Sequence, residues 1–279
     1  MHEKNSTIGN IFARIVLVIW AVGILFPLLW VVYESLKTNQ EFFAGVWDLP
    51  ASPQFVNYAV AWDTMGLGRS VLNTIIVVGF SLFFGLSLTT LCAYCFTRLE
   101  WKGKKLWWSV ILLSLFLPGI NAMVPQYILM KNLHLLGKLT GLIVLYSIGI
   151  GAFDLMLLGG FLGSIPKELE ESARIDGASI FKTFRSIVVP LATPGIVTVG
   201  IFKFLGLYND FLTPYIMLNS EKKYTIGVRM FHANQQMQYK TNWVGLFAGV
   251  VIAMIPSLIV YILFQRKVIE GATLGGVKG

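Results

Sequence analysis

The chain has 279 residues, of which 56% are hydrophobic and only 13% are charged, and its formal net charge is +8. A soluble domain of this length carries about a quarter charged residues, so this composition excludes an ordinary soluble protein and predicts an integral membrane protein. The basic residues flank apolar runs, which favours lipid headgroups over nucleic acid as the partner of the positive charge.

Six apolar segments are long enough to cross a membrane as helices, which takes about 20 residues each. Only helices satisfy their own backbones in lipid over such lengths, and the alternating pattern of a membrane β-barrel is missing. The predicted fold is therefore an all-α integral membrane protein, with a single domain over residues 1–279. The spans are expected at about residues 15–33, 71–96, 106–130, 140–165, 191–218 and 243–264.

The first span can also be mistaken for a secretory signal peptide. Its apolar part is longer than a typical signal-peptide core, and no small-residue cleavage motif follows it, so we interpret it as an uncleaved span. The loop after it, residues 34–69, is expected to be ordered and rich in turns. The third span is unusual because it contains Pro118, Gly119 and Pro125.

The distribution of basic residues predicts the orientation of the chain. An even number of spans places both termini on one side of the membrane. Thirteen of the 22 Lys and Arg residues lie on that side, eight lie on the other side with its two longest loops, and Lys203 lies inside a span. The positive-inside rule therefore predicts a multi-pass protein with both termini, and the segment 166–190, in the cytoplasm.

The segment 166–190 is polar, although both of its neighbours are apolar. Ser164 and Pro166 are typical of a helix start, and the acidic residues that follow suit the positive end of a helix dipole. Gly177 is placed to adopt a left-handed conformation after this helix. Asp176 or Ser179 can cap a second helix, whose apolar residues fall on one face: Ile180, Phe181, Phe184, Ile187 and Val188. Pro190 ends that helix or bends it into the fifth span.

The spacing in this segment resembles the "EAA" signature of the permease subunits of binding-protein-dependent ABC importers. That signature is E-A-A, three residues, G, nine residues, then I-x-L-P, and it is matched by Glu171, Ala173, Gly177, Ile187 and Pro190. Two positions depart from it, Ser172 and Val189, and both exchanges are small or apolar. The run IPKELEESARIDGAS is similar to the carbohydrate branch of the family, which includes the smaller maltose-permease subunit.

Two further stretches extend this resemblance over the second half of the chain. LYNDFLTPYIML, from Leu207 to Leu218, resembles the W-N-D/E-F-x-x-P stretch of that branch, with Tyr208 where Trp is usual. FQRKVIEGATLGGVKG, at residues 264–279, resembles its F-x-x-x-F/Y-x-x-G-x-x-x-G-A-V-K-G ending. The resemblance implies a sugar permease in a bacterial or archaeal cell (inner) membrane.

The resemblance also implies partners and roles. The expected partners are a second homologous permease subunit, two ABC ATPase subunits and an extracytoplasmic binding protein. The chain itself is expected to hold no cofactor, with ATP and Mg²⁺ in the partner subunits. The residues expected to couple to the ATPase are Glu168, Glu171, Ser172, Ala173, Asp176, Gly177 and Pro190.

Other regions supply candidates for substrate and binding-protein contact. The candidates for the translocation path are Asp154, Tyr208, Asn209 and Asp210. Asp154 and Lys203 can pair between spans, or Lys203 can extend to the inner surface, and Asp210 can equally be a structural hydrogen-bonding group. The loop at 219–242, with Asn234, Gln235 and Gln236, is expected to reach toward the binding protein. The tail at 271–279 is expected to become ordered only in the assembled complex.

Other functional classes are less well supported. The three histidines lack metal-binding or nucleophile-activating neighbours, Cys92 and Cys95 lack further ligands nearby, and no G-x-x-x-x-G-K-[ST] motif is present, so an enzyme is disfavoured. A secondary transporter remains an alternative, as does an ABC permease for a non-sugar solute such as a glycerol-phosphate or a polyol. The energy source, ATP or an ion gradient, distinguishes the first of these from an ABC importer.

Overall fold

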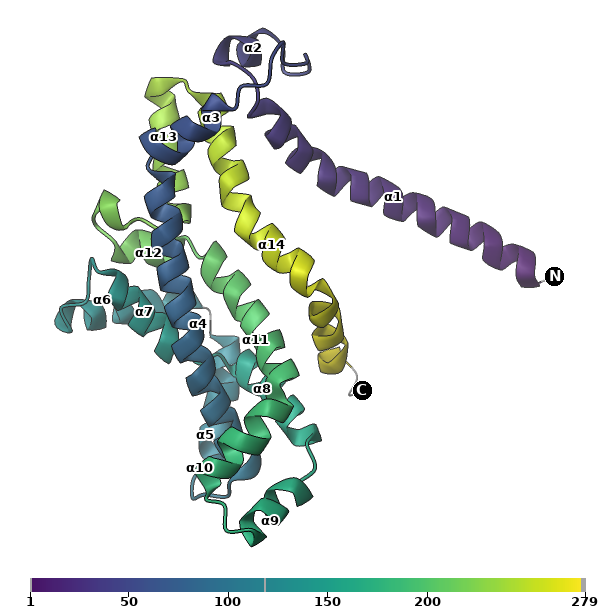
Figure 1. Ribbon diagram of the computed structural model, residues 1–279, viewed down its shortest axis with the longest axis vertical. Helices are drawn as coiled ribbons and strands as arrows, with labels where there is room; N and C mark the ends of the chain where they lie inside the picture. Colours follow the sequence, from purple (N-terminus) through teal and green to yellow (C-terminus); the bar gives the residue numbers. More distant parts are fainter. Residues whose placement is uncertain (1, 118, 277–279) are drawn as a thin grey trace. The chain divides into compact units, whose positions relative to one another are not determined.

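The computed structural model describes the backbone of residues 2–117 and 119–276, and the side chains of residues 9–117, 119, 122–236 and 241–265. The described residues contain helices and connecting segments, with no β-strand among them, which confirms the predicted all-α fold (Figure 1). They form two compact units, one from residues 1–68 with 229–255 and the other from residues 69–228 with 256–279. The expectation of a single domain over the whole chain stays a prediction.

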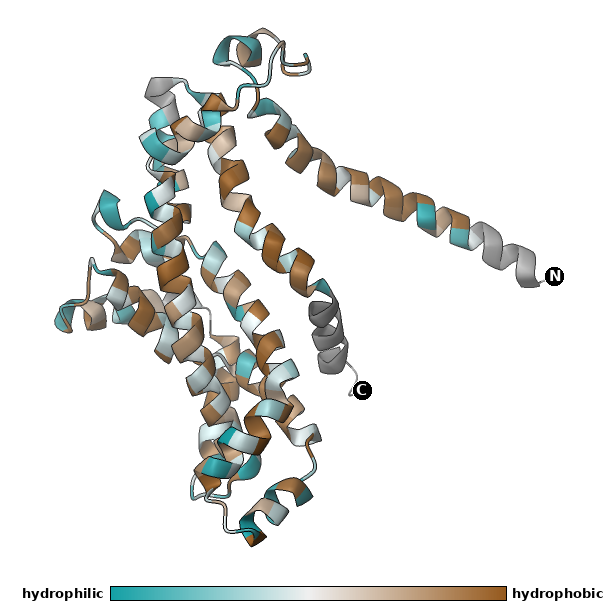
Figure 2. Cartoon of the chain, viewed as in Figure 1, coloured by the Kyte–Doolittle hydropathy of each residue, from teal (hydrophilic) through white to brown (hydrophobic). Residues whose placement is uncertain are grey.

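Among the described residues, four helical stretches are long and apolar enough to cross a membrane. They are Gly9–Glu34 of α1 (His2–Glu34), α4 (Leu67–Arg98), the stretch Ile180–Asn209, and Trp243–Gln265 of α14 (Trp243–Gly276). The apolar residues run along most of α1 and α4 (Figure 2). These stretches contain or overlap the first, second, fifth and sixth predicted spans.

The fourth predicted span is a pair of helices. α7 (Leu139–Ile148) and α8 (Ala152–Ser164) meet at an angle of 51°, with the glycines Gly149 and Gly151 between them. Glycine favours such a break because it lacks the side chain that stabilises a helix. Counted as one crossing, this pair brings the number of candidate spans to five.

The third predicted span, 106–130, is wrong as a continuous helix. α5 (Lys104–Leu113) gives way to the 3₁₀ turns η2 (Ser114–Phe116) and η3 (Gly119–Ala122), and α6 (Met123–Asn132) follows. Leu117, which precedes a proline in the sequence, has an extended backbone with φ −92° and ψ 120°. A proline disfavours helical backbone in the residue before it, so the break has a direct physical cause.

Two apolar cores lie among the described residues of the second unit. One gathers buried residues of α4, α8 and the stretch Ile180–Asn209, which consists of α10 (Ile180–Thr183), the π-helical turn η4 (Phe184–Val188) and α11 (Val189–Asn209). The other gathers residues of α4, α6, α7 and α12 (Leu212–Met217). α8 and α11 approach closely at Gly195, where an added Cβ would lie 2.5 Å from Phe161.

The fifth predicted span, 191–218, is not one helix. It consists of the part of α11 that ends at Asn209 and of the separate helix α12.

The first unit holds a buried ionic network in the segment that follows α1. Glu34 and Lys37 are both fully buried, and the amine of Lys37 donates to Glu34 at 2.9 Å and to the carbonyls of Gly45 and Val46 at 3.1 and 3.0 Å. Asn57, in α3 (Val56–Ala59), donates to two carbonyls of the same segment. The loop expected at residues 34–69 is therefore ordered, and it contains α2 (Asn39–Ala44), α3 and the π-helical turn η1 (Val60–Thr64).

Replacing Lys37 should destabilise this unit strongly. Lys37→Met leaves the buried Glu34 carboxylate without a counterion, which costs about 3–5 kcal/mol of stability. The double variant Glu34→Gln/Lys37→Met should recover a large part of that loss. Thermal unfolding of the purified protein in detergent measures both, with Lys222→Met at an exposed lysine as the matched control. A Lys37→Met variant as stable as the control would contradict a structural role for the pair.

Candidate functional site

The polar segment forms a short helix, α9 (Glu168–Ile175), which lies at one end of the second unit (Figure 1). Its first turn carries Glu168, Glu170 and Glu171, as the helix dipole favours. The carbonyl of Lys167 accepts from the backbone N–H groups of Glu170 and Glu171 at 2.9 and 3.0 Å. The charged helix predicted from the sequence is therefore present.

The predicted capping role of Ser164 is wrong. Ser164 is the last residue of α8, and its hydroxyl donates to the carbonyl of Phe161 at 2.7 Å. The N-cap of α9 is Lys167, which makes no side-chain cap hydrogen bond. Pro166 explains the difference, because it favours extended backbone at Ile165, whose φ is −75° and ψ is 128°, and so separates the two helices.

The end of α9 is a Schellman turn. Gly177 has φ +76°, the N–H of Gly177 donates to Arg174 at 3.0 Å, and the N–H of Ala178 donates to Ala173 at 2.9 Å. The predicted left-handed glycine is confirmed. An added Cβ at Gly177 would meet no atom within 4 Å, so backbone conformation alone requires glycine here.

The predicted coupling residues divide between a solvent-facing surface and a packed face. Glu168, Glu171, Ser172, Asp176 and Gly177 are exposed, and Ala173 is buried. Pro190 is exposed as well, but it lies in the first turn of α11, beyond α10 and η4. The structure therefore brings the residues from Glu168 to Gly177 together on one short element and leaves Pro190 on another.

An ion pair that the sequence analysis missed attaches α9 to the rest of the unit. Nε of Arg98, the last residue of α4, lies 3.0 Å from Oε1 of Glu170, close enough for an ion pair but without the alignment of a hydrogen bond. The two side chains are only 3% and 5% exposed. Tyr94 donates to the other carboxylate oxygen of Glu170 at 2.9 Å. Two side chains of α4 therefore hold one buried carboxylate of α9.

Arg98 also holds the end of α8. Its guanidinium donates to the carbonyls of Leu162 and Ile165, which are among the groups at a helix C-terminus that lack partners within the helix. A cavity of about 170 Å³ lies beside this contact, lined by Arg98, Lys167, Glu170, Glu171 and Arg174. The sequence gives one indication of which face of α9 packs against the unit. Glu170 and Ala173, its two buried residues, are three positions apart and therefore lie on the same face of the helix.

The second helix packs against the unit through two of its apolar residues. Ser179 accepts a hydrogen bond from the backbone N–H of Lys182, which confirms one of the two predicted caps. Phe184 and Val188 are buried, and the Phe184 ring lies 5.0 Å from that of Tyr94. Ile180 and Phe181 are exposed on the chain, and the Phe181 ring lies 6.5 Å from that of Phe184. The single apolar face at the membrane surface stays a prediction.

The charges predicted inside the membrane form two contacts. The amine of Lys203 in α11 lies 3.4 Å from a carboxylate oxygen of Asp154 in α8, and it donates to the carbonyl of Gly149 at 3.1 Å. Lys203 is buried, so it pairs with Asp154 and does not extend to the surface. The hydroxyl of Tyr146 donates to Asp210 at 2.8 Å, and the backbone N–H of Thr213 donates to the other oxygen of Asp210 at 3.2 Å.

A cavity of about 480 Å³ opens at these contacts. Its lining includes Gln126, Tyr146, Asp154, Lys203 and Thr213, which come from α6, α7, α8, α11 and α12. Of the four predicted path residues, only Asp154 lines it, and Tyr208, Asn209 and Asp210 do not. The amide of Asn209 donates to the carbonyl of Leu205, and Tyr208 is buried with its ring stacked on that of Phe204.

The segment expected as a loop at 219–242 is largely helical. Between the fifth and sixth predicted spans, α13 runs over Ile226–Lys240, and Asn234, Gln235 and Gln236 are exposed on it, so their contact with the binding protein stays a prediction. The side chains of residues 237–240 lie outside the described part. The tail expected at 271–279 also lies mostly outside it: the backbone is helical to Gly276, and residues 277–279 are not described.

Almost the whole chain matches the model of one protein family. Residues 3–269 match the model of the binding-protein-dependent transport system inner membrane component. The chain belongs to this family. As a member, it is similar over nearly its whole length to curated transport permeases from bacteria.

Two curated relatives illustrate the similarity. The diacetylchitobiose uptake system permease protein NgcG of Streptomyces coelicolor is 34% identical, over 93% of this chain and 86% of that protein. The probable starch degradation products transport system permease protein AmyC of Thermoanaerobacterium thermosulfurigenes is 30% identical, over 92% of this chain and 95% of that protein.

Among solved structures, a chain of a bacterial ABC transporter involved in the import of alginate has a similar fold. It matches with a TM-score of 0.83 and 23% identity, over 95% of this chain and 98% of that one. The likeness shows that this inner membrane component has the fold of an ABC importer chain.

Removing Arg98 should release α9 from the unit. Arg98→Leu leaves the Glu170 carboxylate buried without its counterion, so local opening should become at least tenfold more favourable, given about 3–5 kcal/mol for such a change. Trypsin cleavage after Lys167 and Arg174 measures that opening in protein reconstituted into nanodiscs. Arg98→Leu/Glu170→Leu should restore much of the protection. Lys102→Leu, at an exposed neighbour, is the control, and equal cleavage rates in it and Arg98→Leu would refute the attachment.

Proposed function

We propose that the chain is a membrane-spanning permease subunit of an ATP-driven importer, and forms half of the path for a sugar or oligosaccharide that an extracytoplasmic binding protein delivers. The observation that carries this proposal is α9, an exposed charged helix tied to the membrane helices by the buried pair of Arg98 and Glu170. A partner subunit that binds the exposed side of such a helix can move the membrane helices to which it is attached. Membership of the binding-protein-dependent family supports the same function.

The proposed topology has six crossings, with both termini in the cytoplasm of a bacterial or archaeal cell. Five candidates are the four long helices and the bent pair of α7 and α8. The sixth is the broken segment of α5 and α6, in which two shorter helices with a bend between them cross together. Broken helices occur in transport proteins where the interrupted backbone lines a cavity or is covered by protein. The excess of basic residues on the side of the termini supports this orientation.

The proposed partners follow from what this chain lacks. It has no phosphate-binding G-x-x-x-x-G-K-[ST] motif, so ATP and Mg²⁺ would be held by two ATPase subunits. The exposed residues of α9, Glu168, Glu171, Ser172 and Asp176, would meet one of these subunits, with Gly177 shaping the turn behind them. A second homologous permease would supply the other half of the path, and Asn234, Gln235 and Gln236 would face the binding protein.

A sugar is the substrate class that the relatives favour. Those described above are named for diacetylchitobiose and for starch degradation products. The cavity beside Asp154 offers paired charges and hydroxyls, which suit the donors and acceptors of a sugar better than a large apolar solute. Asp154 and Lys203 compensate each other, whereas an ion-coupled transporter needs an intramembrane group free to change its charge. We therefore favour a sugar over a glycerol-phosphate or a polyol as the substrate, and ATP over an ion gradient as the energy source.

The test is sugar-stimulated ATPase activity of the assembled complex in nanodiscs, measured with a panel of binding proteins and their oligosaccharides. The native chain should show stimulation by at least one pair, and Gly177→Val should abolish it. Valine at φ +76° is strongly strained, so the end of α9 would be displaced.

Gly163→Val is the matched control, because Gly163 is exposed on α8 without a positive φ. This control should retain stimulation. Normal stimulation in Gly177→Val would contradict the role of α9, and uptake that an uncoupler abolishes would contradict an ATP-driven importer.

A further inference from the structure

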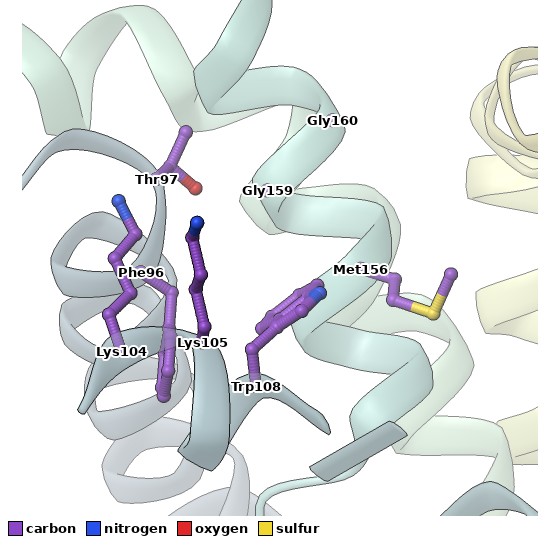
Figure 3. Close-up of a pocket in the computed structure, with 8 residues that line it drawn as sticks. All are labelled: Phe96, Thr97, Lys104, Lys105, Trp108, Met156, Gly159 and Gly160. Carbon is purple, nitrogen blue, oxygen red and sulfur yellow. The ribbon is translucent and has the colours of Figure 1, made fainter. Parts of the chain in front are cut away.

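The strongest unassigned feature is a cavity of about 420 Å³ between α4, α5 and α8 (Figure 3). It is separate from the path cavity and lies near the end of α4. Its lining is Phe96, Thr97, Lys104, Lys105, Trp108, Met156, Gly159 and Gly160. Figure 3 shows the amine ends of both lysines directed toward the side where Thr97 lies, whereas the Trp108 ring lies toward Met156.

The cavity is therefore polar at one side and apolar at the other. Phe96 forms part of the apolar side, and its ring lies 5.4 Å from those of both Trp101 and Trp108, which fixes its position. Gly160 keeps the α8 side open, since an added Cβ there would meet no atom within 4 Å. A molecule with a charged head and an apolar body fits such a site better than a free ion does.

The two lysines differ in how far their charge is compensated. Lys104 donates to Glu100 at 2.8 Å and to the carbonyl of Leu99 at 3.0 Å. Lys105 makes no ion pair within the part of the chain that the structure describes. A side-chain hydrogen bond from Lys104 holds the pKa of Glu100 below its ordinary value, with the charges of Lys104, Lys167 and Lys105 contributing as well. The uncompensated charge of Lys105 therefore leaves the polar side of the cavity positive.

The surroundings place the cavity at the depth of lipid headgroups. Trp101, Trp107 and Trp108 lie within eight residues of one another beside Lys102 and the two lysines of the cavity. Tryptophan gathers at the membrane–water interface, and clusters of basic residues next to a span attract anionic lipids on the cytoplasmic face. α5 begins here at Lys104 without a side-chain cap, so the positive end of its dipole adds to the attraction.

We propose that this cavity binds the headgroup of an anionic phospholipid from the cytoplasmic leaflet. The phosphate lies near Lys105 and Lys104, and the glycerol and the start of the acyl chains lie over Phe96, Trp108 and Met156. The assignment to this leaflet rests on the proposed topology. Bound there, the lipid would brace α5, the first half of the broken crossing, against α4 and α8.

The test measures lipid retained by the full chain in its assembled complex. Complexes are moved from nanodiscs of phosphatidylcholine and phosphatidylglycerol into mild detergent, and the retained lipids are quantified by mass spectrometry. Lys104→Gln/Lys105→Gln should weaken retention of phosphatidylglycerol by about tenfold or more, since each basic residue near an anionic surface contributes about a fivefold change. Lys131→Gln/Lys138→Gln, at exposed lysines of another part of the unit, should retain it like the native chain.

A second variant separates a built site from surface charge. Gly160→Leu fills the cavity with both lysines present, and it too should lose phosphatidylglycerol. Full retention by Gly160→Leu, or equal loss in the Lys131 and Lys138 control, would overturn the site. Displacement of the lipid by inorganic phosphate would assign the cavity to a free anion instead. The readout is retained lipid, so a negative result differs from a failure of sugar-stimulated ATPase activity.

Discussion

The buried ion pair of Arg98 and Glu170 is the constraint on which the position of α9 depends. An eight-residue helix of low hydrophobicity is too short to be stable by itself in water. It persists here because one carboxylate is held by Arg98 and Tyr94, while Arg98 also binds the end of α8. A buried charge is costly without its partner, so this contact holds α9 in one place and keeps its other acidic residues free for a second protein.

A continuous set of packed contacts leads from this pair into the membrane helices. Tyr94 touches Phe184 of η4, Phe184 and Val188 share a core with α8, and α11 carries Lys203 to its contact with Asp154. Force applied to α9 would therefore reach α4, α8 and α11 together, and α11 and α8 line the path cavity. Close-packed interiors transmit displacement as movement of whole elements, which is what an ATP-driven permease needs.

Local chemistry was predictable from the sequence, and long-range pairing was not. Gly177, Ser179 and the acidic first turn of α9 obey rules that act within a few residues, and they were placed correctly. The helical break near Leu117 was signalled by its prolines and glycine, but hydrophobicity alone made that segment look like one span. Arg98 and Glu170 are 72 residues apart in the numbering, and neither has a periodic pattern that names its partner.

Because the Arg98–Glu170 pair attaches α9 to α4, α9 is expected to move with the membrane helices as one body. Spin labels at Ile175 on α9 and Ser87 on α4, both exposed, report the distance between these helices after Cys92 and Cys95 are replaced by serine. Pulsed electron paramagnetic resonance on the assembled complex should give the same narrow distance distribution with and without ATP, and a broad one in Arg98→Leu. A shift of the native distribution when ATP binds would show that α9 moves independently of α4, and would contradict its rigid attachment.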